Sequence, residues 1–260
     1  MNVFVFDIET VPDTQAGRRL YQLSDELSDA EVAELMFHRH RQAKGGSEFL
    51  PHHLHQVVAI SVVFRREQHI KVWSLGEIDA GEKEVVQRFF DGIEKFSANL
   101  VSWNGGGFDL PVLNYRALVN GVVAHRYWDT GENDQQMRWN NYLSRYHQRH
   151  TDLMDVLAMY TGRANAPLDD LATMLGFPGK LGMSGAKVWE AYHNGDIQSI
   201  RDYCESDVLN TYLLYLRFEL MRGNLLPDDY QRECELLRQY LSEPEAPEHF
   251  KTFLSAWEAA

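Results

Sequence analysis

Cysteine is scarce in this chain of 260 residues, and long apolar runs are absent. Its two cysteines are too few for a disulfide framework, which favours a reducing, cytoplasmic location. No stretch of about 18 apolar residues occurs, so we expect no transmembrane helix and no membrane partner. The first ten residues, MNVFVFDIET, lack the basic region and the long apolar run of a secretory signal.

Basic residues are also fewer than acidic ones: 25 Lys and Arg face 38 Asp and Glu, which gives a formal net charge of −13 at pH 7. A protein that coats DNA neutralises many phosphates with Lys and Arg. The acidity therefore counts against a sequence-specific DNA binder with an extensive surface. It does not exclude an enzyme that handles only a few terminal nucleotides, because acidic metal sites add formal negative charge that bound cations offset.

The apolar pattern that is present predicts a mixed α/β sheet flanked by helices. Short apolar runs predict strands at residues 2–6, 57–64, 70–73 and 100–103, the first of them ending at Asp7. Helical spacing of apolar residues predicts helices at 83–96, 110–120, 153–160, 168–175, 186–192 and 196–221.

Two segments lie outside this alternating pattern. Residues 13–55 form a long excursion with a charged helical stretch at 29–42 and a loose stretch at 44–47. Such an excursion inside a compact domain is usually functional or mobile. The tail, residues 227–260, is predicted to form two polar helices packed on the outside.

Asp7 and Glu9 follow the first strand. Residues i and i+2 of a strand point to the same side, so the two carboxylates project together. Two such charges repel each other unless a cation lies between them. A merely solvated strand end is the alternative interpretation.

A second acidic position follows three glycines, in the run from Asn104 through Phe108 to Asp109. The glycines allow the backbone to approach a ligand closely, and Pro111 suits the first turn of the helix that follows. A plain turn with Asp109 as a helix N-cap explains the same residues, and the two roles of Asp109 can coexist.

Tyr203 and Asp207 are four residues apart in the longest predicted helix and therefore share one face. Asp207 lies near the apolar stripe of that helix, where a carboxylate needs a partner. Tyr203 alone is explained as well by ordinary packing. Asp202 and Glu205 fall on other faces, and we expect both to be solvated.

Together these positions supply four carboxylates and one phenol. Such a set can hold two divalent ions about 3.5–4 Å apart, which stabilise the attacking and leaving oxygens of a phosphodiester displacement. Mg²⁺ and Mn²⁺ are the hard cations that prefer these oxygen ligands.

The order and the wide spacing of the motifs resemble the DEDD exonuclease superfamily, in its version with tyrosine in the third motif. The similarity is to stand-alone relatives of the proofreading exonuclease domain of family B DNA polymerases. The motifs that carry it are Asp7-x-Glu9-Thr10, Asn104-x-x-x-Phe108-Asp109 and Tyr203-x-x-x-Asp207. The resemblance implies an RNase H-like fold with a mixed five-stranded sheet over residues 1–222, a helical insertion at about 14–55, and a helical extension at 223–260.

The resemblance also implies roles for the acidic residues. Asp7, Glu9 and Asp207 would hold the first metal ion. Asp7 would bridge to the second ion, which Asp109 would reach directly or through water. The reaction would be 3′→5′ removal of nucleoside 5′-monophosphates.

The remaining residues of the three motifs would handle water and substrate. Tyr203 would orient the attacking water, and Thr10 would touch the terminal nucleotide. Asn104 and Phe108 would line the adjoining strand. A single-stranded DNA 3′ end is the substrate that the resemblance favours. An exoribonuclease of the same mechanism and a non-catalytic nucleic-acid-binding module are the alternatives.

Some features remain open from the sequence alone. His52, His53 and His55 suit either a zinc site or a plain loop. Asp152 is most simply an N-cap, and Asp155 a capping partner or a supporting acid.

Charged and aromatic clusters have two interpretations as well. The basic residues of the excursion suit either substrate phosphates or a solvated helix face. They are Arg18, Arg19, Arg39, Arg41 and Lys44. The aromatic stretch 126–149 suits either base stacking or packing of this segment on the body of the protein.

Overall fold

The central strand of this computed structural model, β1 (Asn2–Pro12), is buried on both faces because its apolar side chains alternate. Phe4 and Phe6 point into one helical layer. Val3 and Val5 point into the other. The strand therefore holds the two halves of the core together.

Four more strands join β1 in one mixed sheet. They are β2 (His55–Arg66), β3 (His69–Ser74), β4 (Asn99–Ser102) and β5 (His150–Asp152). Their order is β3-β2-β1-β4-β5. β1 is antiparallel to β2 and parallel to β4, and β5 is parallel to β4. This arrangement confirms the predicted five-stranded sheet.

The prediction that the first strand ends at Asp7 is wrong. β1 continues to Pro12, and Asp7 and Glu9 stay paired with Ser61 and Ala59 of β2. Backbone hydrogen bonds hold this part of the strand, and they do not depend on the polarity of the side chains. A β-bulge follows Glu9 and interrupts the regular pairing.

A strand at His150 was not among those predicted from the apolar pattern. Residues His150–Asp152 form the edge strand β5 before helix α6 (Leu153–Leu157) begins. Three residues are too short for a periodic pattern, so only pairing with β4 defines this strand.

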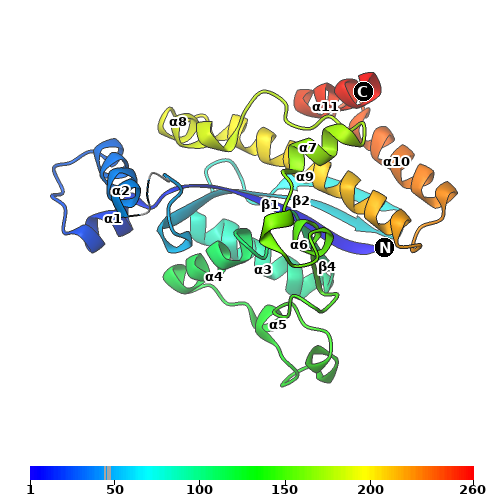
Figure 1. Cartoon of the computed structure of the whole chain (residues 1–260), viewed down its shortest axis with the longest axis horizontal. Helices are drawn as coiled ribbons and strands as arrows, with labels where there is room; N and C mark the ends of the chain where they lie inside the picture. The colour runs from blue at the N-terminus through cyan, green and yellow to red at the C-terminus, as the bar shows by residue number, and fades with distance from the viewer. Residues whose placement is uncertain (44, 46–47) are drawn as a thin grey trace.

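Helices cover both faces of the sheet (Figure 1). One layer consists of α3 (Glu82–Phe96) and α4 (Asp109–Asn120). The opposite layer is built on α9 (Ile197–Met221), with α7 (Leu168–Met174), α8 (Val188–His193), α10 (Pro227–Leu241) and α11 (Glu248–Ala259) around it. Short 3₁₀ helices occur at His52–Leu54, Gln135–Arg138, Gly162–Ala164 and Gly185–Lys187.

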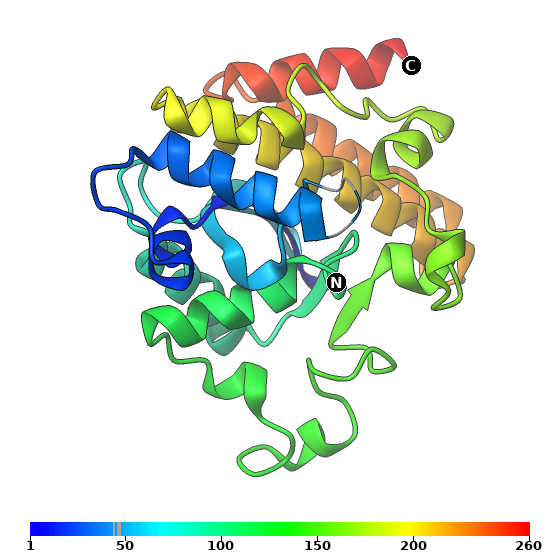
Figure 2. The same cartoon turned by 60° about the vertical axis from the view of Figure 1, so that its left-hand side comes forward.

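The excursion after β1 forms α1 (Thr14–Tyr21) and α2 (Asp29–Ala43), which lie beyond one end of the sheet (Figures 1 and 2). Val32 and Met36 of α2 form a small core of their own with Leu50 and Leu54. The structure describes residues 1–43, 45 and 48–260. Most of the predicted loose stretch 44–47, including Lys44, lies outside the described residues.

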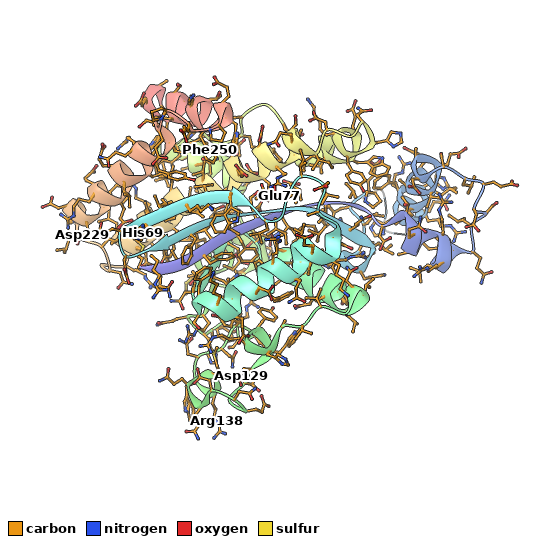
Figure 3. All side chains as sticks on the ribbon, turned by 180° about the vertical axis from the view of Figure 1, so that it is seen from behind. His69, Glu77, Asp129, Arg138, Asp229 and Phe250 are labelled. Carbon is orange, nitrogen blue, oxygen red and sulfur yellow. The ribbon has the colours of Figure 1, made fainter. Side chains whose placement is uncertain are left out.

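Residues 121–149, which we call the lobe, extend from the body between α4 and β5. The lobe contains α5 (His125–Trp128), and Figure 3 shows Asp129 and Arg138 in its outer part. Tyr127 packs against Phe90 of α3, and Tyr142 donates to the carbonyl oxygen of Ala98, so these two buried residues pack the lobe on the body.

The C-terminal helices α10 and α11 pack on α9, and α10 also contacts β3. Arg65 of β2 makes two hydrogen bonds of 2.7 Å to the carboxylate of Glu233 in α10. The division into a domain of residues 1–222 and an extension of 223–260 stays a prediction. Within the described ranges, none of the helices has the length and apolarity needed to span a membrane.

Arg116 of α4 ties the excursion to the body through buried ion pairs. Its guanidinium lies 2.5 Å from Asp13 and binds Glu82 through two hydrogen bonds of 2.6 and 2.7 Å. Asp13 in turn caps α1 by accepting from the Ala16 N–H, at 2.9 Å. Glu82 also accepts from the N–H of Val57 in β2. One side chain thus fixes the ends of β1, β2 and α3.

Arg116→Ala should lower the free energy of unfolding by about 3–5 kcal/mol, because it leaves two buried carboxylates without their cation. Urea denaturation followed by circular dichroism measures the change. Arg88→Ala is the matched control, since Arg88 pairs with Glu84 on the surface and should cost about 0.5 kcal/mol or less. Equal costs for the two variants would contradict the structural role of Arg116.

Candidate active site

Asp7 and Glu9 lie on the face of β1 that packs against α9. The strand alternation places them on the same side as Val11, which contacts Tyr203 and Cys204 of α9. Asp7, Glu9 and Cys204 offer ligand atoms that all lie within 4.8 Å of one another. The predicted acidic pair is therefore enclosed by a helix and is not a solvated strand end.

Tyr203 and Asp207 occupy adjacent turns on the buried side of α9, as their spacing predicts. Their exposed fractions are 6% and 8%. Asp196 caps the first turn of this helix by accepting from the Ser199 N–H. The hydroxyl of Tyr203 faces the Asp207 carboxyl. After burial, the negative charges of Asp207 and Glu9 raise the pKa of this hydroxyl.

Asp109 reaches the same point from the opposite helical layer. It is the first residue of α4, whose N-cap is Phe108, so the predicted N-cap role of Asp109 is wrong. The backbone N–H groups of Asp109 itself and of Ile8 in β1 partly offset the rise that burial causes in the pKa of its carboxyl. Its charge acts on both Asp7 and Glu9.

Asp152, at the end of β5, holds the glycine turn that delivers Asp109. Its carboxylate accepts from the N–H of Asn104 at 2.9 Å and of Gly106 at 2.8 Å. It also accepts from the N–H of Asp155, at 3.3 Å, which confirms its predicted N-cap role in α6. Asp152 is therefore a positioning residue. Asp155 binds Arg145 in the lobe.

The first glycine of the turn is required by space. A Cβ on Gly105 would lie 2.2 Å from Oγ of Ser102 and 2.5 Å from its Cβ. Asn104 adopts a left-handed φ of 65°, which Asn tolerates better than most residues. The turn therefore approaches the end of β4 closely and directs the following helix to the site.

Burial and mutual repulsion oppose ionisation of all four carboxyls. Burial raises the pKa of Asp109 to about 7 and that of Asp207 to about 6. The pKa values of Asp7 and Glu9 are raised well above their usual range, first by burial and then by the neighbouring carboxylates. Four acids that resist ionisation at one point need a cation to become anionic together.

The donor set fits a divalent cation. Among the residues that the structure describes, Oδ1 of Asp207 is buried and has no hydrogen-bond partner. An unpaired buried oxygen is costly unless another ligand satisfies it. The positive charge of Lys180 offsets part of the rise in the pKa of Glu9 and of Asp207. The side chain of Lys180 is exposed, however, so it does not occupy the site. Carboxylate oxygens are the ligands that hard divalent ions prefer.

Two neighbours of the site were not expected from the sequence. Lys180 lies in the loop before α8, and no local pattern links it to Glu9. The thiol of Cys204 lies 3.7 Å from Oδ2 of Asp7, and burial raises its pKa. Cys204 thus remains a neutral donor beside the acidic pair.

A groove of about 630 Å³ opens from Glu9 and contains the predicted substrate residues Thr10 and Phe108. Lys180 and Trp189 form its other side. Asn104 lies outside this groove, on the far side of the glycine turn.

The histidine cluster supports these residues and forms no metal group. His55 uses one ring nitrogen for the Thr10 hydroxyl, at 2.9 Å, and the other for the Leu50 carbonyl. His52 lies 2.9 Å from the carbonyl oxygen of Gly107. In the described part of the chain, the one group of three with metal-ligand spacing is that of Asp7. The loop interpretation of the cluster is therefore the better one.

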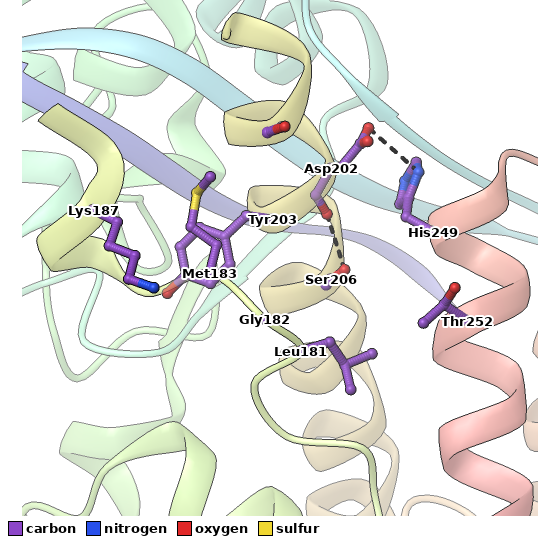
Figure 4. Close-up of a pocket in the computed structure, with 10 residues that line it drawn as sticks. Leu181, Gly182, Met183, Lys187, Asp202, Tyr203, Ser206, His249 and Thr252 are labelled. Atoms are coloured by element: carbon purple, nitrogen blue, oxygen red, sulfur yellow. Dashed lines mark hydrogen bonds and ion pairs between the residues drawn. The ribbon is translucent and has the colours of Figure 1, made fainter. Parts of the chain in front are cut away.

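The expectation that Glu205 is solvated is wrong. Glu205 is buried and accepts from the Ser74 hydroxyl at 2.7 Å, and it lies 2.8 Å from Nε2 of His249 in α11. The other ring nitrogen of His249 lies 3.3 Å from Asp202 (Figure 4). This bridge holds α11 against the helix that carries Tyr203.

The basic residues of the excursion mostly serve local structure. Arg18 binds Asp29 and the carbonyl oxygens of Ser24 and Leu27, and Arg41 pairs with Glu48. The solvated-face interpretation therefore suits Arg41, whereas Arg18 is largely buried and fits neither interpretation.

The chain is similar to a known protein family over most of its length. The family model for a predicted 3′–5′ exonuclease related to the exonuclease domain of PolB matches residues 47–257. Exonuclease domains of this kind use divalent metal ions. No curated protein matches the chain.

The fold is similar to part of the family B DNA polymerase from the hyperthermophilic archaeon Pyrobaculum calidifontis, with a TM-score of 0.50 and 20% identity. The match covers 85% of this chain and 24% of the polymerase chain. At this identity the likeness shows the RNase H-like fold alone. Because the family model spans most of the chain, the protein belongs to the family of predicted 3′–5′ exonucleases related to the exonuclease domain of PolB.

Proposed function

We propose that the protein is a two-metal-ion exonuclease that removes nucleoside 5′-monophosphates from the 3′ end of single-stranded DNA. The observation that carries this proposal is the convergence of four carboxyls from β1, α4 and α9, with raised pKa values and an unpaired Asp207 oxygen. A non-catalytic binding module has no need for this costly arrangement.

Asp7, Glu9 and Asp207 would hold one ion, and Asp7 with Asp109 would hold the other. Mg²⁺ and Mn²⁺ suit this all-oxygen set. When bound, the two ions supply charge stabilisation for the attacking and leaving oxygens. Cys204 keeps its proton and donates toward Asp7, which leaves the carboxylates as the ligands.

Tyr203 would position the attacking water. Burial and the adjacent carboxylates raise its pKa above the usual range, so the phenol stays neutral and acts through hydrogen bonds rather than as a base. Lys180, exposed at the mouth of the groove, would meet the negative charge of the phosphate without blocking the ligands.

The groove beside Glu9 would receive the terminal nucleotide. Phe108 offers a half-buried ring that packs against His52, His55 and Phe49, and bases stack on such rings. Thr10 is held by His55 at the same place. This end of the sheet would thus form a binding site for one nucleotide next to the carboxylates.

Asp7→Ala should abolish Mg²⁺- or Mn²⁺-dependent release of mononucleotides, because it removes the ligand shared by both ions. End-labelled single-stranded DNA resolved on a gel measures the loss, and EDTA should stop the wild-type reaction. Glu258→Gln, an exposed change on α11, is the control and should retain full activity. Continued cleavage by Asp7→Ala would place the chemistry elsewhere.

Single-stranded DNA should be cleaved faster than RNA of matched sequence. Discrimination between them requires contact with the 2′-OH, so initial rates on paired oligonucleotides decide the assignment. Equal or faster cleavage of RNA would replace the DNA assignment with an exoribonuclease of the same mechanism.

The metal-free protein should lose stability as pH rises from about 4 to about 7. A carboxyl whose folded pKa is raised keeps its proton in the folded state after the unfolded chain has lost it, so the free energy of unfolding falls across this window. Asp109→Asn removes one such group, and the fall should become shallower by at most about 1.4 kcal/mol per pH unit.

Thermal unfolding in EDTA at pH 5, 6, 7 and 8 measures this slope. Mn²⁺ should raise the midpoint of the wild type more at pH 8 than at pH 5, because ligation requires the ionised carboxylates. An identical pH slope for the wild type and Asp109→Asn would show that Asp109 is not held in its neutral form.

A further inference from the structure

We propose that a second groove, between the glycine turn and the lobe, binds the upstream nucleotides of the single strand. This inference rests on the proposed function, because it extends the path of the same substrate. The groove has a volume of about 710 Å³. Tyr160 and Trp128 would stack the bases, and Arg145 would contact the backbone.

The position of this groove suits a strand whose 3′ end lies at the carboxylates. Asn104, Gly106 and Gly107 form one of its walls. The turn continues through Phe108, which lines the terminal-nucleotide groove, to Asp109 of the site. The two grooves therefore lie on either side of one short turn. A polymer that ends in the first groove can continue into the second.

Two partly exposed rings face the second groove. Tyr160 has an exposed fraction of 37% and Trp128 of 51%. Trp128 is held edge-on by the buried Tyr127, at a centroid distance of 5.2 Å. Tyr146 packs edge-on against Tyr160 at 5.0 Å. Large rings held in this way offer stacking surfaces without much loss of side-chain entropy.

The backbone that presents Tyr160 is strained. Met159 and Tyr160 adopt left-handed φ angles of 50° and 59°. This region is unfavourable for residues other than glycine, and two such residues follow each other here. The Tyr160 N–H binds the Asp155 carbonyl oxygen at 2.8 Å and fixes this conformation. Strain of this kind gathers at functional positions, and here it directs a ring to the groove.

Arg145 is positioned before any strand binds. Its Nε and Nη2 bind the carboxylate of Asp155, and its guanidinium lies 5.0 Å from the centroid of the Tyr160 ring. Nη1 is the amino group directed away from Asp155, and it can meet a phosphate oxygen. Arg145 and Tyr160 together form a cationic and aromatic edge, which suits single-stranded nucleic acid.

The charge of the lobe supports this occupant. Residues 121–149 contain four arginines and three acidic residues, whereas the whole chain carries a net charge of −13. A polyanion would approach the site over the lobe with least repulsion.

Tyr160→Ala and Arg145→Gln test the groove with two substrates. The long substrate is an oligothymidylate of twelve nucleotides, and the short one is the p-nitrophenyl ester of thymidine 5′-monophosphate, which needs only the terminal-nucleotide groove. We expect KM for the oligonucleotide to rise at least about fivefold in Tyr160→Ala, with kinetic constants for the ester unchanged. Tyr160→Phe should retain the wild-type KM for the oligonucleotide, because phenylalanine keeps the aromatic ring.

Trp139→Ala is the matched control, since Trp139 is 79% exposed on the same lobe but does not line the groove, and its kinetics should stay as in the wild type. Tyr160→Leu replaces Tyr160→Ala if the smaller side chain unfolds the protein. Fluorescence anisotropy of the labelled oligonucleotide in an Asp7→Asn background should show the same rise in Kd.

An unchanged KM and Kd for the oligonucleotide would overturn this inference and assign the groove to another partner, such as a protein segment. An equal loss on the oligonucleotide and the ester would also overturn it, because the variant would then act on the site itself. If the wild type cleaves neither substrate, the proposed function fails, whereas the anisotropy series still tests the groove by itself.

Discussion

The mutual repulsion of four buried carboxyls is the constraint on which the rest of the structure depends. Asp7, Glu9, Asp109 and Asp207 come from three elements and meet where burial opposes their ionisation. The surrounding fold must hold them together against this cost. Ion pairs away from the site, such as that of Arg65 with Glu233, fasten the elements of the frame to one another. The same repulsion is the reason for which we propose that the site binds divalent cations.

The glycine turn connects this electrostatic centre to the substrate path. The carboxylate of Asp152 accepts hydrogen bonds from two backbone N–H groups of this turn. The turn passes between the two grooves and leads to Asp109. A rigid turn of this kind serves two purposes. It fixes the position of Asp109, a proposed metal ligand, and it separates the proposed site of the terminal nucleotide from that of the upstream nucleotides.

Periodicity in the sequence predicted most of the elements, because the alternation of strands and the spacing of helices are written in local apolar patterns. It failed where pairing with a neighbour decides the outcome. β1 continues past Asp7 because β2 pairs with its backbone. β5 exists because β4 lies beside it. Glu205 is buried because Ser74 and His249 approach from β3 and α11, and no local pattern records them.

The sequence by itself determined which side chains share a face. Asp7 and Glu9 project together because of the strand period, and Tyr203 and Asp207 do so because of the helical period. Only the tertiary structure decided that Asp109 meets them from the opposite layer and that Cys204 and Lys180 lie beside them. It also decided that Tyr160 and Arg145 face one groove. The physical reason is that local periodicity sets the direction of a side chain along its own element, whereas packing across the sheet sets what that side chain meets.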